Sequence, residues 1–279
     1  MGAPAPEMRM VARQIVVPVF QHHRIAGRPE RERGHERRGA PGEAARGALE
    51  RAERSMEGAE EALRNDDLAG ALEDQADAME ALREGMRALD AVVYTHAHLD
   101  HVVGFDELRA FCWRKDGPLP LHATEECMAT LKRMFGWAFS EENVYLGYVK
   151  PDPRVIRGAF SYGELKVTPL PGGHGSVETI GYLFEPHGAR SIAYLPDVKR
   201  IPHTTMDSIR RVDVLVVDSL RPSPHPTHFS LTEALEAIHE AEPDEAWLTH
   251  LGHENDHGAL EKELPRGVRV AWDGLRIEL

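Results

Sequence analysis

Hydrophobic residues recur at helical spacing over residues 43–89, a segment dominated by Ala, Glu, Arg, Leu and Met, which are all good helix formers. The apolar positions that keep this spacing are Leu49, Ala52, Met56 and Leu63 in the first half and Leu68, Leu72, Met79, Leu82, Met86 and Leu89 in the second. Between the halves, Asn65-Asp66-Asp67 reads as a turn that supplies an N-cap for the second helix. The pattern predicts a helical hairpin whose two arms each carry a thin apolar stripe.

From residue 90 onward the pattern changes, and short apolar runs alternate with helical stretches. The predicted strands cover residues 91–94, 155–156, 165–170, 180–185, 191–195, 212–218 and 245–249. The predicted helices cover residues 106–112, 124–135 and 231–240, with Thr124 as the N-cap of the second. By itself this alternation predicts a mixed α/β domain over residues 90–279.

The first 42 residues follow neither pattern. Residues 14–20 could form one short strand, and residues 22–42 are rich in Arg, Glu, Gly and Pro without a hydrophobic period, as in a flexible linker. We therefore expect three segments: an irregular N-terminal segment (1–42), a helical hairpin (43–89) and a larger α/β domain (90–279).

Composition and charge narrow the class of protein. No apolar run reaches the roughly 20 residues that a membrane span needs, and no secretory signal is visible, so we expect a cytoplasmic protein. The two cysteines, Cys112 and Cys127, suggest neither a metal pair nor a disulfide framework. The net charge of −13 argues against general nucleic-acid binding. It does not argue against a small phosphorylated substrate, because bound metal ions can supply positive charge.

The most informative run is Thr95-His96-Ala97-His98-Leu99-Asp100-His101, directly after the apolar residues 91–94. A strand that ends there delivers three imidazoles and one carboxylate into a single loop. The alternating spacing places His96 and His98 on the same side of an extended backbone, and Asp100 and His101 follow where the chain must turn. Neutral imidazole nitrogens and carboxylate oxygens are ligands for Zn²⁺, Mn²⁺ and Fe²⁺.

This HxHxDH motif resembles that of the metallo-β-lactamase superfamily, and the resemblance extends over residues 88–279. The family places a further His, a bridging Asp and a final His after later strands, and His174, Asp197 and His250 stand at matching positions. The resemblance implies two metal sites joined by Asp197: His96, His98 and His174 in one, and Asp100, His101 and His250 in the other. It also implies an αββα sandwich, here with an atypical N-terminal helical hairpin in place of the usual first strands.

Within the superfamily the chain is similar to the phosphodiesterase branch, which includes the cyclic-phosphate phosphodiesterases of the carbon–phosphorus lyase pathway. The similarity rests on residues 104–109 after the metal motif, on Pro226-Thr227-His228 before a predicted helix, and on the tail at 264–275. It implies a hydrolase that holds two divalent ions, Zn²⁺ or Mn²⁺, and cleaves a small cyclic or diester phosphate with the hydroxide between them.

The resemblance and the chemistry of histidine also suggest roles around the metals. Asp100 would orient the nucleophile as well as bind metal. His228 would contact the phosphate and act as general acid for the leaving alkoxide, because an imidazole titrates near neutral pH. His253, shortly after the last predicted ligand, would contact the phosphate.

Other functions remain open at this point. A tRNase Z-like nuclease would need a basic docking surface or an RNA-binding arm, which the acidic balance disfavours. A thioester or lactam hydrolase is disfavoured by residues 226–228. A catalytically impaired fusion or interaction protein is disfavoured because none of the seven predicted ligands is missing. The absence of the usual first strands would leave a sheet edge uncovered, which would favour a homodimer.

Overall fold

The computed structural model describes residues 51, 54–56, 58–59, 61–65, 67–86, 89–112, 117–143, 145, 147–272, 275 and 277. The strand expected at residues 14–20 and the linker expected at residues 22–42 lie outside this part of the chain.

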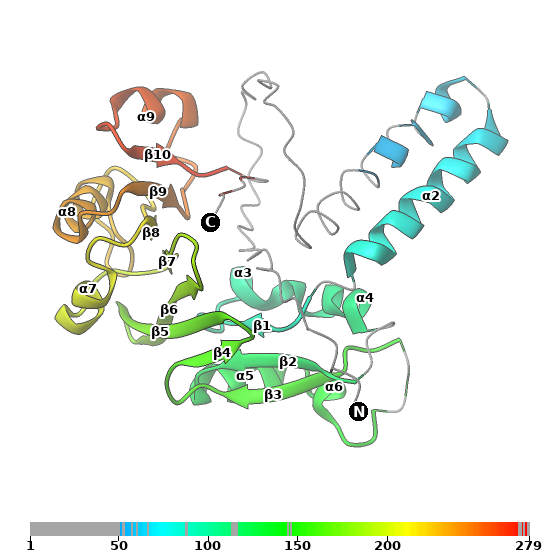
Figure 1. Ribbon diagram of the computed structural model, residues 1–279, viewed down its shortest axis with the longest axis horizontal. Helices are drawn as coiled ribbons and strands as arrows, with labels where there is room; N and C mark the ends of the chain where they lie inside the picture. The colour runs from blue at the N-terminus through cyan, green and yellow to red at the C-terminus, as the bar shows by residue number, and fades with distance from the viewer. Residues whose placement is uncertain are drawn as a thin grey trace, which may run out of the picture.

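The helical hairpin begins the described part. Helix α2 spans Leu68–Met86, and the described residues from 51 to 64 that precede it are helical too. Asp67 caps α2 as the sequence predicts, because the Gly70 N–H donates to Asp67 Oδ1 at 3.0 Å. The side chains of Ala59 and Ala71 are buried, whereas Leu68 and Leu72 on the predicted apolar stripe are exposed. Figure 1 shows the hairpin projecting away from the sheets. No helix in the described ranges is both long and apolar enough to cross a membrane.

Two sheets form the rest of the fold. The smaller is parallel, with the order β1-β2-β3, and the larger has the order β10-β9-β8-β7-β6-β5-β4, antiparallel from β4 to β7 and parallel from β7 to β10. Their strands are β1 Val92–Val93, β2 Leu119–Ala123, β3 Pro151–Val155, β4 Phe160–Tyr162, β5 Leu165–His174, β6 Val177–Pro186, β7 Ile192–Leu195, β8 Val214–Asp218, β9 Glu245–Thr249 and β10 Val268–Val270.

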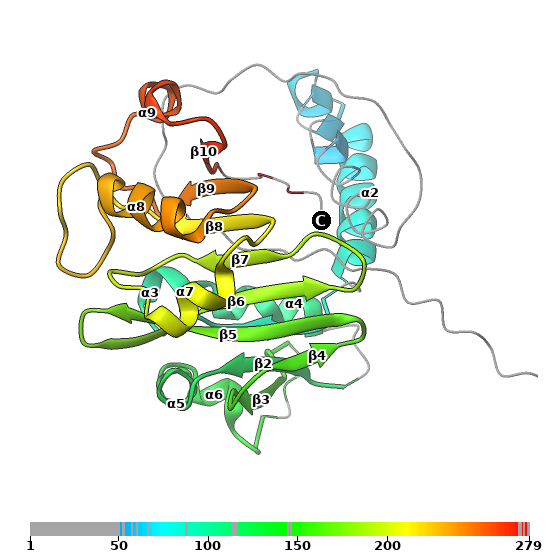
Figure 2. The same cartoon turned by 60° about the vertical axis from the view of Figure 1, so that its left-hand side comes forward.

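Helices cover the outer face of each sheet (Figures 1 and 2). They are α3 Leu99–Val102, the 3₁₀ helix η1 Val103–Leu108, α4 Arg109–Cys112, α5 Glu125–Met134, α6 Gly136–Phe139, α7 His203–Ile209, α8 Leu231–Ala241 and α9 His257–Glu263. Strand β8 shows how the layers form, since it is buried on both faces. Its Leu215 and Val217 join the cluster that includes α7 and α8, while Val214 and Val216 join the cluster between the sheets. The layer order is therefore helices, small sheet, large sheet, helices, as the resemblance implies.

Side-chain caps set the first residues of helices α5 and α8. The hydroxyl of Thr124 accepts the Cys127 N–H at 3.3 Å and begins α5, as predicted. At α8, Ser230 and Glu233 form a reciprocal capping box, in which the Ser230 N–H donates to Glu233 Oε2 at 2.8 Å. This box fixes the end of the loop that runs from β8 to α8.

Several elements differ from the sequence expectation. The helix predicted over residues 106–112 is confirmed in part, because Arg109–Cys112 is α-helical but Val103–Leu108 forms a 3₁₀ helix. Tertiary packing overrides helix propensity here, since Phe105 is buried in a stacked contact with Phe135 at 4.3 Å. Strand β2 was not predicted, since Pro120 is its second residue and proline disfavours the interior of a strand. In the described residues β1 stands at the end of its sheet, which fits the expected lack of the usual first strands.

One hydrogen bond joins the two sheets just before the histidine-rich loop: Tyr182 Oη on β6 donates to the Tyr94 carbonyl at 2.6 Å, and both residues are buried. Tyr182→Phe should lower the free energy of unfolding by about 1–3 kcal/mol, because a buried carbonyl loses its donor. Tyr148→Phe, at a tyrosine that is 40 % exposed, is the matched control and should change little. Equal urea midpoints for Tyr182→Phe and the wild type would contradict the prediction.

A second stability prediction concerns His122 of β2, whose Nε2 lies 2.5 Å from Tyr162 Oη and whose ring stacks on Phe160. Burial, followed by the charge of Arg154, lowers the pKa of His122. Its stabilising contribution is therefore complete above the unfolded pKa of about 6.5 and is lost as the pH falls through the lower folded pKa. Unfolding measured at about pH 8 and about pH 5.5 should show the advantage of the wild type over His122→Gln shrinking with acid. A constant difference would contradict this assignment.

Candidate metal centre

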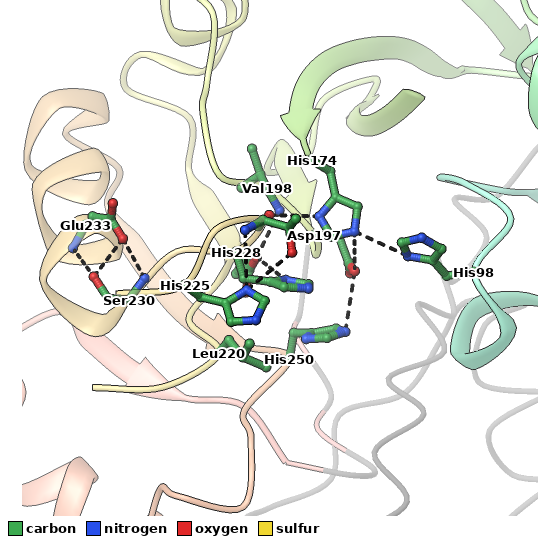
Figure 3. Close-up of polar contacts among 12 residues, drawn as sticks. His98, His174, Asp197, Val198, Leu220, His225, His228, Ser230, Glu233 and His250 are labelled. Atoms are coloured by element: carbon green, nitrogen blue, oxygen red, sulfur yellow. Dashed lines mark hydrogen bonds and ion pairs between the residues drawn. The ribbon is translucent and has the colours of Figure 1, made fainter. Parts of the chain in front are cut away.

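Six polar residues lie at or just beyond the ends of strands at one edge of the fold. His96 and His98 follow β1, His174 ends β5, Asp197 follows β7, Asp218 ends β8 and His250 follows β9. Because β7, β8 and β9 are parallel, their carboxyl ends meet at the same edge, where open α/β sheets usually bind ligands. Figure 3 shows the carboxylate of Asp197 between His174 and His250, with His98 facing the same nitrogen of His174 as this carboxylate does.

The first group of converging side chains contains His96, His98, His174 and Asp197. His98 Nδ1 lies 2.9 Å from His96 Nε2 and 3.2 Å from His174 Nε2. Asp197 Oδ2 lies 3.6 Å from His96 Nε2 and 3.9 Å from His174 Nε2. Ligand atoms of a tetrahedral Zn²⁺ site, with bonds of about 2.0–2.1 Å, lie about 3.3 Å apart. The four side chains therefore have the spacing of a tetrahedral ligand set.

The second group contains Asp100, His101, His250 and again Asp197. His101 Nε2 lies 3.1 Å from Asp197 Oδ1, and His250 Nε2 lies 3.5 Å from Asp197 Oδ2. Asp100 Oδ2 approaches His101 Nε2 at 3.4 Å and His250 Nε2 at 3.3 Å. The structure thus brings all seven predicted ligands together, in the two groups that the resemblance implies, with Asp197 common to both.

Asp197 provides the test of whether metal ions fit here. Its side chain is almost fully buried, and neither carboxylate oxygen accepts a hydrogen bond from a donor in the described ranges. A buried anion without donors is costly unless a cation stands beside it. The donor set around it consists of imidazole nitrogens and carboxylate oxygens, which suit Zn²⁺ and Mn²⁺. The residues present therefore fit a divalent-metal centre.

Contacts behind the ligands hold their rings in place. His174 Nδ1 lies 2.8 Å from the Thr227 carbonyl and must donate to it, which leaves Nε2 with a free lone pair facing the group. His96 Nδ1 lies 3.1 Å from Thr95 Oγ1, and its Nε2 likewise faces the group. Sequence patterns did not reveal this role of Thr227, because a backbone carbonyl that orients a ligand carries no side-chain signature.

The electrostatics differ between the two groups of side chains. Burial lowers the pKa of His96 to about 3, so its ring is neutral. Burial raises the pKa of Asp197, but its close contact with His101 and the charges of His250, His101 and His96 outweigh this effect, and the net shift of the pKa is downward. Burial lowers the pKa of His101, but its contacts with Asp100 and Asp197 raise it to about 9. In the absence of metal, His101 therefore carries the proton that a bound cation displaces.

His228 lies beside the ligand groups. Its ring centroid is 4.5 Å from that of His174 and 4.8 Å from that of His250. Its Nδ1 lies 2.8 Å from Asp218 Oδ2, an oxygen that also accepts the Val198 N–H at 2.9 Å. Asp218 thus orients the ring of His228 and not the ring of one of the seven predicted ligands. Burial lowers the pKa of His228 to about 4 and raises the pKa of Asp218.

His253 lies apart from the metal centre. The side chain of His253 is 81 % exposed and lies 3.6 Å from Glu254, and it belongs to neither group of converging side chains. The structure therefore does not bring His253 to the centre, and its phosphate contact stays a prediction.

His250 adopts a left-handed backbone conformation, with φ of 58°, which is unusual for a residue with a side chain. Such strain is typical of residues held in place for function.

Comparison with known families places the centre within a known domain. Residues 67–251 match the family described as the beta-lactamase superfamily domain, which covers all the converging side chains. Residues 26–98 also match a domain of unknown function, DUF4175.

Individual proteins give a similar picture. A diphosphatase of the PhnP family has a solved structure that is 32 % identical, with a TM-score of 0.63, covering 74 % of this chain and 76 % of that one. Zinc-bound PqqB from Methylobacterium extorquens is 20 % identical, with a TM-score of 0.54, covering 71 % of this chain and 80 % of that one, and shows similarity of fold alone. An octanoyltransferase of Porphyromonas gingivalis is 31 % identical over 200 residues, 67 % of this chain. The chain spans only 37 % of that relative's length.

The shared position of Asp197 makes metal content a sharp test. Asp197→Ala should lose most of the bound metal, because both groups lose a ligand and the remaining imidazoles lose their counter-charge. The measurement is metal per chain by mass spectrometry after loading with Zn²⁺ or Mn²⁺ and desalting, with the exposed His187→Ala as control. Metal should also raise the melting temperature of the wild type and not that of Asp197→Ala. Undiminished metal in Asp197→Ala would show that the carboxylate is not a ligand.

Proposed function

The chain belongs to the β-lactamase superfamily, and we propose that this metal-dependent hydrolase cleaves a small cyclic or diester phosphate. The observation that carries the proposal is the pairing of His228 with Asp218 next to the ligand groups. This arrangement sets a proton carrier beside a centre that attracts anions. The 32 % identity to a PhnP-family diphosphatase supports a phosphorus substrate rather than a carbonyl one.

Two divalent ions, Zn²⁺ or Mn²⁺, would occupy the centre. His96, His98 and His174 would hold one, and Asp100, His101 and His250 the other, with Asp197 between them. When bound, such ions lower the pKa of water and stabilise negative charge on a phosphoryl group. Asp100, whose side chain is 57 % exposed, is the ligand best placed to orient the attacking water.

His228 and Asp218 would manage the proton of the leaving group. Because Nδ1 of His228 faces Asp218, Nε2 is the nitrogen left for the substrate. Burial pushes both groups toward neutrality, so the pair titrates as a unit. Consider the pair with one proton more than an Asp218 carboxylate and a neutral His228 imidazole have together. One proton then lies between Asp218 and Nδ1 of His228, and Nε2 carries the other, whichever of the two groups holds the shared proton. The proton on Nε2 can pass to the leaving alkoxide. The Asp218 carboxylate then accepts a hydrogen bond from Nδ1 of the neutral ring.

The first experiment is a substrate comparison with metal-loaded protein. We expect hydrolysis of bis(p-nitrophenyl) phosphate and of a cyclic nucleotide, and turnover of a β-lactam and of a thioester that is lower by at least about 100-fold, since a site built for phosphate leaves a carbonyl substrate poorly matched. His98→Ala and Asp197→Ala should abolish diester hydrolysis. Preference for the thioester or the β-lactam would overturn the proposal.

The proton-carrying role predicts a separate effect. His228→Ala should lower kcat by about 10²- to 10⁴-fold while the metal content stays that of the wild type. Asp218→Asn should show a smaller fall in kcat and a shifted pH profile, because the ring keeps its place but loses the anion. Both falls in kcat should be smaller with a substrate whose leaving group is p-nitrophenolate, because this leaving group needs no proton. If His228→Ala lost its metal instead, His228 would be a ligand and not a proton carrier.

A further inference from the structure

A second histidine stands next to His228 on the same loop, and the ligand groups do not use it. His225 is half-buried, and its ring centroid lies 5.2 Å from that of His228 (Figure 3). The loop that carries both rings runs from the end of β8 to the capping box of α8. His228 is the inner residue of the pair, against His174, and His225 is the outer one.

The hydrogen bonds of His225 decide which ring nitrogen can donate. The Thr227 N–H donates to His225 Nδ1 at 3.3 Å, and Thr227 Oγ1 lies 3.2 Å from the same nitrogen. A nitrogen that accepts a backbone N–H carries no proton, so the neutral ring holds its hydrogen on Nε2. Within the described part of the chain this Nε2–H has no hydrogen-bond acceptor. It is a donor held ready for a ligand.

The loop that carries His225 is fixed to the metal centre. Arg221 Nη2 donates to the Pro224 carbonyl at 2.9 Å, and Arg221 Nε donates to the Ser223 carbonyl at 3.3 Å. The Thr227 carbonyl accepts from His174 Nδ1 at 2.8 Å, so the residue that sets the tautomer of His225 also orients a predicted ligand. His225 is therefore held in a set position relative to the centre, as a substrate-binding residue must be.

Two cationic side chains, Arg221 and Lys199, lie near His225. After burial, the groups that lower its pKa are His228, Arg221, Lys199 and His174, in that order. Lys199 and Arg221 share their charges with Glu233 and Glu254 respectively, so neither forms a strong anion site alone. An N–H donor among these groups suits a negatively charged oxygen better than a neutral one.

We propose that His225 is a specificity-determining residue that donates its Nε2–H to a second anionic group of the substrate, next to the phosphate that His228 contacts. This rests on the proposed function and narrows the substrate to disubstituted phosphates in which one substituent of the scissile phosphorus is a second phosphoryl group, as in the phosphoric anhydrides of nucleotides. It adds no chemical step.

His225→Asn is the most informative variant, because the Asn oxygen can still accept the Thr227 N–H while the Nε2–H donor is lost. With metal-loaded protein, kcat/KM for adenosine 5′-diphosphate should fall by about tenfold or more, mainly through KM, because a hydrogen bond to a charged group is lost. The value for bis(p-nitrophenyl) phosphate, which has no second anionic group, should change less than about twofold. His225→Ala should repeat the selective loss, and His187→Ala is the control. The dissociation constant of pyrophosphate, measured by calorimetry, should rise by the same factor in His225→Asn.

The outcomes separate this inference from the proposed function. Equal losses on both substrates would mean that His225 only supports the loop, and no loss would mean that it does not contact substrate, and either result overturns the inference. Absence of any phosphoester hydrolysis by the wild type would overturn the proposed function. In that case pyrophosphate binding by the wild type and by His225→Asn would still decide whether His225 holds an anion.

Discussion

The buried carboxylate of Asp197 is the group on which the arrangement of this molecule depends. It lies among four imidazoles, on a loop that follows β7, and its oxygens have no hydrogen-bond donors in the described residues. A bare anion in such surroundings costs several kcal/mol unless positive charge compensates it. The ends of β1, β5 and β9 bring the imidazoles to it, so the order of strands in the two sheets is linked directly to the chemistry of the centre.

The loop between β8 and α8 ties the metal centre to the groups that would handle substrate. At one end Asp218 holds His228, and at the other the capping box of Ser230 and Glu233 fixes the start of α8. Between them, Thr227 orients both His174 and His225. A displacement of this loop would therefore disturb a predicted ligand and both neighbouring histidines together. Such a connected set of polar contacts keeps the rings within the narrow geometry that catalysis needs.

The net charge of the whole chain and the charge close to the metal centre favour different kinds of ligand. The net charge of −13 disfavours long nucleic acids, which need an extended basic surface. Lys199 and Arg221 stand near the centre, however, and bound metal ions would add further positive charge there. A small substrate senses this local field more than the distant carboxylates, because charges beyond a Debye length are screened. This distribution of charge supports the proposed small anionic substrate rather than a polymer.

The sequence by itself determined the family, the sandwich and the identity of the seven converging residues. The predicted family and fold class are confirmed by the match to the beta-lactamase superfamily domain and by the similarity to the PhnP-family diphosphatase. Strands such as Glu245–Thr249 were predicted with the observed bounds, because a short apolar run between polar turns has few other solutions. The phosphate contact of His253 and the roles of the ligands stay predictions.

Only the tertiary structure decided how the polar groups pair, because pairing depends on which strand ends meet in space. The partnership of His228 with Asp218, the carbonyl of Thr227 behind His174 and the exposure of His253 leave no trace in spacing or composition. The 3₁₀ conformation of Val103–Leu108 likewise follows from the burial of Phe105 and not from helix propensity. Hydrophobic pattern and motif spacing act over a few residues along the chain, whereas these contacts join residues that only folding brings together.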